Sequence, residues 1–396
     1  MTADRFLPPA HPLPEPLRGN EAGTFAADTV TRRLPEIARR TGAENILDAT
    51  RRQLVEALAA EIGPTPLSPI DEPENADRAL WAQHVAPYLD STWLDAPWFF
   101  IETYFFRRLL AATGYSQPGM RRGVDPFREQ KRLATEGAME LAAQLGDGLD
   151  RFPLLLASSL WANRVDLSLW PADDAESVRH RQVFAPAATD RMLVDDTRET
   201  VDALAKATSV HIVLDNAGPE LVADLALTAA LLSTGTRVTL HTKPHPTFVS
   251  DATPSDVGST VERLAAAETS ASRLAELVLA GSQRLRLRIS SHAFWVSPQP
   301  MWECPLDLAA ELADADLIVV KGDANYRRML GDLHWEPTVP LSEIVRPHRS
   351  LVALRTAKSE IAAGLSATTI TNVEQEDPAW LTNGCWGMVQ YVPADR

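Results

Sequence analysis

The chain has 396 residues, of which 45% are hydrophobic and 23% are charged, with a formal net charge of −15 and a pI of about 5.1. This length suits one or two globular domains. The acidic balance argues against nucleic acids and anionic membranes as partners, because both require basic surfaces. Two cysteines, Cys304 and Cys385, are too few for a disulfide framework or a cysteine-rich zinc site. No apolar segment resembles a signal peptide or approaches the ~20 residues of a membrane span, so we expect a cytoplasmic protein.

The first part of the chain is predicted to be mostly helical. Residues 1–20 are proline-rich and should run extended over the surface. Apolar residues at three- and four-residue intervals predict a helix from about Thr29 to Gly63, and a further helix begins near Ala76 after a proline-rich break. The segment WFFIETYFFRRLLAATG predicts a core helix that ends at Gly114, a residue suited to a helix C-terminus. No convincing strand precedes residue 185.

From there on, short β-branched runs alternate with helical patterns. Strands are predicted at residues 191–196, 209–215, 236–242, 284–290, 316–322 and 349–355. Helices are predicted in PELVADLALTAALLSTG and from Ser259 to Ala280. This alternation predicts an α/β fold with a parallel sheet covered by helices on both faces. The segment WGMVQYV is expected to add an edge strand. We predict a helical N-terminal region over residues 1–150 and the α/β domain over residues 151–396.

Polar side chains follow most of the predicted strands. Open α/β sheets bind ligands outside the carboxyl ends of their strands, so these side chains should meet at one edge. They include Asp215, Asn216, Lys243, Asp251, Lys321, Asp323, Arg355 and Lys358. An edge that carries both acidic and basic groups suits a cation together with an anionic substrate.

The segment LDNAGPE is the most informative of these strand ends. Asp215 and Asn216 offer hard oxygen ligands of the type preferred by Mg²⁺ and Mn²⁺. Gly218 permits a tight turn and Pro219 suits the first position of a helix, whose N-terminus attracts anions. Asp251, in VSDAT, could bring a second carboxylate to the same edge. The alternatives are that Asn216 only caps the helix and that Asp251 only forms a turn.

The segment KGDANYRRMLGD places Lys321 and Asp323 at a strand end and opens a helix with Asn325, Tyr326 and Arg327. It resembles a phosphate-binding corner, although it lacks the spacing of a P-loop. The alternative is a capped helix with a solvated basic face. The segment RTAK adds further cations, among them a lysine able to stabilise charge that develops on a transferred phosphate.

Two polar groups in the helical part are ambiguous. Glu102 lies on an apolar helical stripe, where an uncompensated charge is costly, so we expect it to pair with Arg107, Arg108 or another arginine rather than to face a cleft. In SLWANRVDLS the polar residues either face the cleft or form an ordinary helix end. They are Asn163, Arg164 and Asp166.

Several segments together resemble the metal-dependent damage-control phosphatase family. These are VLDNAGPEL, HTKPHPTFVSDAT, DLIVVKGDANYRRMLGD and RTAK, and they resemble in particular the subfamily with an RTxK motif, which includes the acidic-residue methyltransferase-like proteins. RGNEAGTFAADT, WFFIETYFFRR and SLWANRVDLS are also similar to that branch, so the resemblance runs from about residue 15 to 392. It implies a three-layer α/β/α domain with a largely parallel, Rossmann-like sheet and a helical N-terminal region.

The resemblance also implies roles for individual residues. The metal ligands fall on Asp215, Asn216 and Asp251, and the catalytic set adds Asp323 and Lys358. The substrate contacts fall on Asp215, Asn216, Asp323, Ala324, Asn325, Tyr326, Arg327, Arg355 and Lys358. Glu220 lies where the family contacts S-adenosylmethionine, and Glu220, Lys321 and Glu102 are candidates for cofactor contact or for support of the site.

The activity implied by the resemblance is hydrolysis of phosphate monoesters of small metabolites, such as fructose 1-phosphate or fructose 6-phosphate, with Mn²⁺, Ni²⁺, Co²⁺ or Mg²⁺. In this hypothesis the cation polarises the phosphoryl group and activates water, while Lys358 with Arg327 or Arg355 neutralises the phosphate oxygens. Asp323 would orient the sugar or act as a general acid or base. The oligomeric state is left open.

Two other functions are weighed against the phosphatase. One is an S-adenosylmethionine-dependent protein carboxyl (glutamate) methyltransferase, which the missing glycine-rich loop after a strand argues against. The other is a non-catalytic sugar-phosphate sensor, which the intact set of oxygen ligands argues against.

Overall fold

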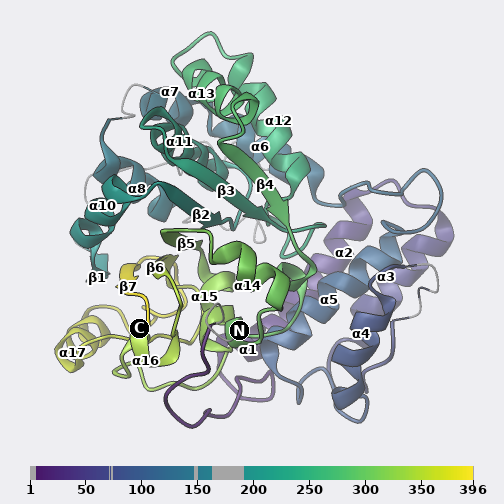
Figure 1. Cartoon of the computed structure of the whole chain (residues 1–396). Helices are drawn as coiled ribbons and strands as arrows, with labels where there is room; N and C mark the ends of the chain where they lie inside the picture. Colours follow the sequence, from purple (N-terminus) through teal and green to yellow (C-terminus); the bar gives the residue numbers. More distant parts are fainter. Residues whose placement is uncertain (1–5, 71, 73–74, 147–149, 163–190, 396) are drawn as a thin grey trace.

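The computed structural model describes residues 6–70, 72, 75–146, 150–162 and 191–395, and its centre is a sheet of seven described strands (Figure 1). The strands are β1 (Met192–Asp195), β2 (Ser209–Val213), β3 (Arg237–Thr242), β4 (Leu287–Ser291), β5 (Leu317–Lys321), β6 (Ser350–Thr356) and β7 (Gly387–Val392). They lie in the order β1-β7-β6-β5-β2-β3-β4, and every neighbouring pair except β6–β7 is parallel. The predicted α/β fold with a largely parallel sheet is confirmed.

The expected edge position of the C-terminal strand is wrong. β7 lies between β6, to which it is antiparallel, and β1, to which it is parallel. Its apolar residues serve both faces of the sheet, since Val389 belongs to one buried cluster and Val392 to another. A strand buried on both faces suits an interior position, whereas the short and partly exposed β1 suits an edge.

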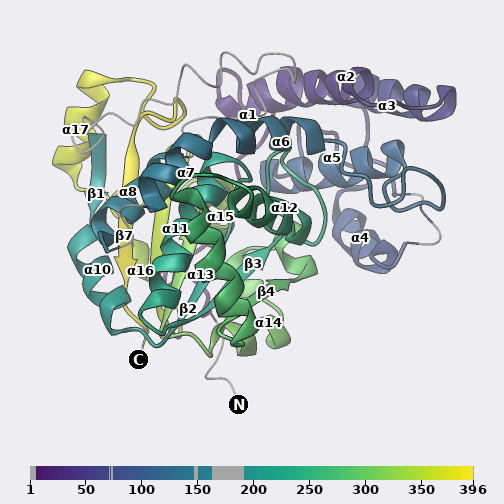
Figure 2. The same cartoon turned by 90° about the horizontal axis from the view of Figure 1, so that it is seen from above.

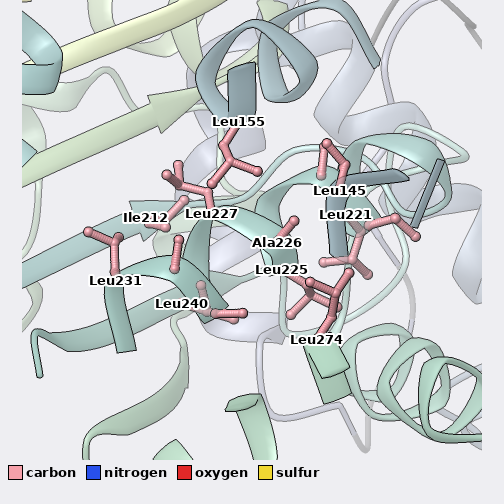
Figure 3. Packing of buried hydrophobic residues seen from close by; sticks show 14 of the residues in the cluster. Leu145, Leu155, Ile212, Leu221, Leu225, Ala226, Leu227, Leu231, Leu240 and Leu274 are labelled. Atoms are coloured by element: carbon pink, nitrogen blue, oxygen red, sulfur yellow. The ribbon is translucent and has the colours of Figure 1, made fainter. Parts of the chain in front are cut away.

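One face of the sheet is covered by a layer of helices around α11 (Pro219–Ser233). The surrounding helices are α7 (Met139–Gly146), α8 (Phe152–Trp161), α10 (Thr197–Lys206), α12 (Pro254–Ala265) and α13 (Ala271–Gln283). Figure 3 shows the leucines of α11 packed among side chains of the sheet and of α7, α8 and α13. α11 is apolar around most of its circumference because it is buried on all sides. The single helix expected from Ser259 to Ala280 is instead two, α12 and α13.

The other face carries shorter helices. They are α14 (Leu306–Leu312), α15 (Asp323–Leu330), α16 (Leu341–Ile344) and the 3₁₀ turns η6 (Ala293–Val296) and η7 (Met301–Glu303). α17 (Ala367–Glu376) packs beside β1 and β7 in a smaller cluster. The two layers and the sheet form the expected α/β/α arrangement (Figure 1).

The N-terminal helices form a group of their own at one end of the sheet (Figure 2). They are α1 (Phe25–Asp28), the π-helical turn η1 (Thr29–Arg33), α2 (Leu34–Glu44), α3 (Ala49–Glu61), α4 (Arg78–Val85), the 3₁₀ turn η2 (Ala86–Tyr88) and α5 (Trp98–Thr113). α6 (Arg128–Gly137) instead contacts α7 and α11 of the layer on the sheet. The helix expected from Thr29 to Gly63 is broken after α2, where Asp48 accepts a hydrogen bond from the Arg51 N–H and caps α3. α5 ends as predicted, with Gly114 in the left-handed conformation.

Two properties of the described chain bear on the sequence analysis. None of its helices combines the length and the apolar character of a bilayer-spanning segment. Cys304 is buried and Cys385 is half-buried, and the two do not form a disulfide.

Candidate functional site

The first strand end, after β2, and the loop after β3 are joined backbone to backbone. Asn216 and Asp251 form an antiparallel bridge. The Ala217 N–H donates to the Ser250 carbonyl at 2.7 Å, and the Ala252 N–H donates to the Asp215 carbonyl at 2.7 Å. The structure therefore brings Asp215 and Asn216 beside Asp251 at the carboxyl edge of the sheet, as the strand order requires.

The Asn216 side chain is oriented by the groups around it. Its Nδ2 donates to Asp215 Oδ2 and to Glu220 Oε2, both at 2.9 Å, and its Oδ1 accepts from the Ser250 hydroxyl at 2.5 Å. The N-cap of α11 is Gly218, with no side-chain cap hydrogen bond. The capping alternative for Asn216 is therefore wrong.

A network of buried charges lies next to the corner formed by Asp215, Asn216 and Asp251. Lys321, the last residue of β5, places its Nζ 2.8 Å from Glu220 Oε1 and 3.1 Å from Asp224 Oδ1. The same Nζ donates to the Ser159 carbonyl at 2.7 Å, and the Ser159 hydroxyl donates to Asp224 Oδ1 at 2.5 Å. Since Glu220 also binds the Asn216 amide, the network links the end of β5 to the predicted metal ligands.

The pKa values of the two predicted ligand acids are raised. Burial raises the pKa of Asp215 well above its usual range, and the charges of Glu220 and Asp251 raise it further, against the effect of Lys243 and Lys321. Burial also raises the pKa of Asp251 to about 6, although Lys243 lies 3.4 Å from its Oδ2. Ionising both acids in this buried corner is costly, and a nearby cation would favour the ionised forms.

The donor set suits a hard divalent cation. Two carboxylates and an amide oxygen are ligand types that Mg²⁺ and Mn²⁺ prefer. A divalent cation would also offset the repulsion between the two buried negative charges. Within the part of the chain that the structure describes, no group of three or more His, Cys, Asp or Glu side chains is arranged to hold a metal ion. A site here would depend on the Asn216 amide as well as on the carboxylates.

The RTAK segment meets the end of β5 at Asp323. The Asp323 Oδ1 accepts hydrogen bonds from Arg355 Nε at 2.7 Å, from the Ser359 hydroxyl at 3.1 Å and from the Lys358 N–H at 3.2 Å. Arg355 also binds the carbonyls of Ser359 and Ile361 at 3.1 and 2.5 Å. Asp323 thus fixes the loop that carries Lys358, and both residues are half-buried at the edge of the sheet.

The remaining residues of DANYR differ in their surroundings. Ala324 is half-buried, whereas Asn325, Tyr326 and Arg327 are buried and bonded to protein groups. Asn325 Nδ2 donates to the carbonyls of Leu214 and Lys321 at 3.1 and 2.8 Å, and its Oδ1 accepts from Lys243 Nζ at 3.0 Å. Asn325 therefore contributes to the walls of the Asp215 corner.

Arg327 is the partner of Glu102. Its guanidinium binds the Glu102 carboxylate, chelates Asp332 at 2.7 and 2.9 Å and lies 3.6 Å above the Trp98 ring. The expected pairing of Glu102 is confirmed, with an arginine from α15. The neighbouring arginines of α5 have other partners, since Arg107 binds Glu72 and Asp77 and Arg108 binds Glu61.

Sequence reasoning missed or undervalued three buried residues of this region. The strand-end position of Lys243 is visible in the sequence, but its contacts with Asp251 and Asn325 are not. Asp224 lies on α11 facing Lys321, in a helix whose apolar character on all sides marks any acid as buried. Lys131 of α6 binds the Asp251 carbonyl, and nothing in REQKRLATEG distinguishes it from a solvated lysine. Asn163, Arg164 and Asp166 lie outside the described residues.

Comparison with known proteins adds independent information. The family model described as damage-control phosphatase ARMT1-like domain matches residues 26–373. Damage-control phosphatase ARMT1 of Mus musculus is 30% identical, over 93% of this chain and 92% of the relative. The Rattus norvegicus protein of the same name is 33% identical, over 76% and 75%. The Homo sapiens protein of that name is 29% identical, over 96% and 98%.

A solved structure of a DUF89 family protein from Pyrococcus horikoshii matches with a TM-score of 0.46 and 17% identity, covering 85% of this chain and 96% of that one. The family match spans every element that carries the corner around Asp215 and the loop of Lys358. The chain belongs to the damage-control phosphatase ARMT1-like domain family.

Proposed function

We propose that this protein is a metal-dependent phosphatase that hydrolyses phosphate monoesters of small metabolites. The observation that carries the proposal is the bridge between Asn216 and Asp251, which joins two buried acids and an amide at the carboxyl edge of the sheet. Membership of a family of damage-control phosphatases supports it. Sugar phosphates such as fructose 1-phosphate and fructose 6-phosphate are the substrates we propose to test first.

Asp215, Asn216 and Asp251 are the residues that would hold the divalent cation, for which Mn²⁺, Ni²⁺, Co²⁺ and Mg²⁺ are candidates. When bound, such a cation supplies Lewis-acid polarisation of the phosphoryl group and activation of a water nucleophile. Lys243, 3.4 Å from Asp251 and hydrogen-bonded to Asn325, would keep the Asp251 carboxylate ionised and oriented.

The substrate would lie between this corner and the RTAK loop. Lys358 would neutralise charge on the phosphate oxygens. Arg355 is occupied by Asp323, Ser359 and Ile361, which supports a role in shaping the loop of Lys358. Asp323 is open enough to accept a hydrogen bond from a substrate hydroxyl or to transfer a proton. Arg327 would act at a distance, since Glu102 and Asp332 bind its guanidinium.

The first test is the Asp215→Asn variant. It keeps the shape of the side chain and removes its charge, so phosphate release from sugar phosphates in Mn²⁺ should fall at least about 100-fold, as expected for a lost metal ligand. Asp307→Asn, which alters an exposed acid, is the control and should keep wild-type activity. Activity that survives in Asp215→Asn, or that a chelator leaves unchanged in the wild type, would contradict the proposal.

The same preparation separates the alternative functions. Methyl transfer from S-adenosylmethionine to a protein carboxylate, without phosphate release, would indicate a methyltransferase. Saturable binding of a sugar phosphate in Mn²⁺ without hydrolysis would indicate a sensor. Either result in place of hydrolysis would overturn the phosphatase assignment.

A further inference from the structure

The loop that carries Asp251 approaches it through an unusual backbone. Phe248 and Val249 have φ angles of 45° and 65°, a region that non-glycine residues rarely occupy, least of all β-branched ones. Such a conformation persists only where the surroundings hold it. Val249 is fully buried in the apolar cluster of the N-terminal helices, and the Phe248 ring lies 5.2 and 6.0 Å from the rings of Phe106 and Phe99 on α5.

A second contact fixes the loop at Asp251 itself. Lys131, a buried residue of α6, donates from its Nζ to the Asp251 carbonyl at 2.8 Å. The other partners of this ammonium are Asp125 at 2.8 Å and Asp256 at 2.9 Å, so all three of its hydrogens are used. Asp256 also accepts from the Thr253 N–H at 2.9 Å in the capping box of α12. Lys131 therefore holds the Asp251 carbonyl directly and, through Asp256, the start of α12 that follows it.

α6 also contacts the loop after β2, which carries Asp215 and Asn216. Gly218 packs so closely on α6 that a Cβ at that position would lie 2.8 Å from the Cβ of Ala134. Ala134 and Lys131 are one turn apart and share a face of α6. One face of α6 thus contacts both loops that supply the candidate ligands.

We propose that the N-terminal helices α5 and α6 set the metal affinity of the site, with Lys131 as the positioning residue for Asp251. This inference rests on the metal site described under Proposed function. Lys131 does not reach the cation or the substrate. It fixes the backbone from which the Asp251 carboxylate projects, so its loss weakens the binding of the cation more than the chemical step.

The test compares Mn²⁺ binding in the wild type, Lys131→Met and Arg108→Met. Arg108 of α5 binds Glu61 at 2.8 Å and the Ser68 hydroxyl at 2.9 Å, neither of which belongs to the Asp251 loop, so it controls for the loss of an ion pair. We expect the Kd for Mn²⁺, measured by calorimetry or by electron paramagnetic resonance, to rise at least about tenfold in Lys131→Met and less than about twofold in Arg108→Met. At saturating Mn²⁺, kcat of Lys131→Met should return to within about threefold of the wild type.

An unchanged Kd in folded Lys131→Met would overturn the inference, and so would an equal rise in Arg108→Met. If Lys131→Met does not fold, Phe106→Leu serves instead, because it loosens the packing of Phe248, and an unchanged Kd there would be equally contradictory. A wild-type protein that binds none of Mn²⁺, Ni²⁺, Co²⁺ and Mg²⁺ would contradict the proposed function itself, which keeps the two failures distinct.

Discussion

At the scale of single residues, the tightest position in the candidate site is Gly322. It follows β5 with φ at +81°, and a Cβ there would lie 1.8 Å from Asp215 Oδ2. Only the absence of a side chain lets the turn after β5 approach the Asp215 carboxylate. Gly322 therefore places the end of β5 directly against Asp215, the candidate metal ligand at the end of β2.

Gly322→Ala should disable the site with little general damage. The positive φ alone costs about 1 kcal/mol of stability, and Gly123→Ala is the control because its φ is +70° in open space. Gly322→Ala must in addition displace Asp215, so we expect at least a tenfold loss of phosphatase activity or Mn²⁺ affinity that Gly123→Ala does not show, roughly the effect of a disturbed metal ligand. Equal activities of the two variants would contradict this.

Lys321→Met tests the buried network beneath Asn216. The substitution leaves Glu220 and Asp224 buried without their cation, which should cost about 3–5 kcal/mol of unfolding free energy in urea. Arg32→Met removes an exposed pair with Asp28 and should cost under about 1 kcal/mol. If Lys321→Met lowered the unfolding free energy by no more than Arg32→Met does, water would have to reach the buried network.

At the scale of elements, β2 and β3 carry a buried histidine pair. His241 Nε2 lies 3.0 Å from His211 Nδ1, and the Trp295 ring meets His241 edge-on at 5.8 Å. Burial lowers the pKa of His211 to about 4, with Arg288 adding to the effect, and burial lowers the pKa of His241 well below its usual value, with His211 adding to it. Both rings are therefore neutral in the folded protein at neutral pH.

The pair predicts a loss of stability in mild acid. Below pH ~6.5 the unfolded chain binds protons that the folded pair does not, so the pair's contribution to stability is present above that pH and falls as the pH drops toward 4. Between pH 7 and 4.5 we expect His211 alone to account for a loss of about 2 kcal/mol, with a further loss in the same direction from His241, and the His211→Leu/His241→Leu double variant should lack both. Chemical unfolding of both proteins at the two pH values measures it. Buried acids such as Asp224, whose pKa burial raises to about 6, act in the opposite direction, so only the difference between the proteins is diagnostic.

The elements also show what could be predicted from the sequence. Long apolar runs identified β2 and β5, and the turn chemistry of Gly218 and Pro219 located the start of α11. The internal place of β7 could not be predicted, because strand order depends on pairing between distant segments rather than on local pattern. The break between α2 and α3 depends on a single cap at Asp48, which the apolar periodicity on either side conceals.

For the site, the residue types and their strand-end positions could be read from the sequence, so the meeting of Asn216 and Asp251 at one edge was expected from those positions and supported by the resemblance. The support from Lys131 was unreadable, because REQKRLATEG has the composition of an exposed helix. A lysine is recognised as buried only when the acids around it, Asp125 and Asp256, are known to converge.

At the scale of the whole molecule, buried ion pairs cross from the N-terminal helices to the sheet. Glu102 on α5 binds Arg327 on α15, and Lys131 on α6 binds Asp256 on α12. The extended segment before α1 adds backbone hydrogen bonds, since the Leu17 N–H donates to the Asp332 carbonyl at 3.1 Å and the Leu17 carbonyl accepts from the Trp98 N–H at 2.8 Å. If the N-terminal helices separated from the rest of the structure, the charges of these ion pairs would lose their partners. The functional division of the chain near residue 150 stays a prediction.

These crossings predict one cooperative unfolding transition. Calorimetry should give a single peak whose calorimetric and van't Hoff enthalpies agree, although chains of this length often unfold in stages. Two resolved transitions, with the first removing only the helical signal of residues 6–146, would show that the crossing pairs are weak.

The internal position of β7 has a consequence for biosynthesis. Among the described strands β1 has β7 as its neighbour, so during synthesis β1 cannot form this pairing until residues 387–392 have been made. A chain truncated before residue 387 would contain every candidate ligand but would lack β7. The edges of β1 and β6 that normally pair with β7 would then be exposed and could associate with other nascent chains.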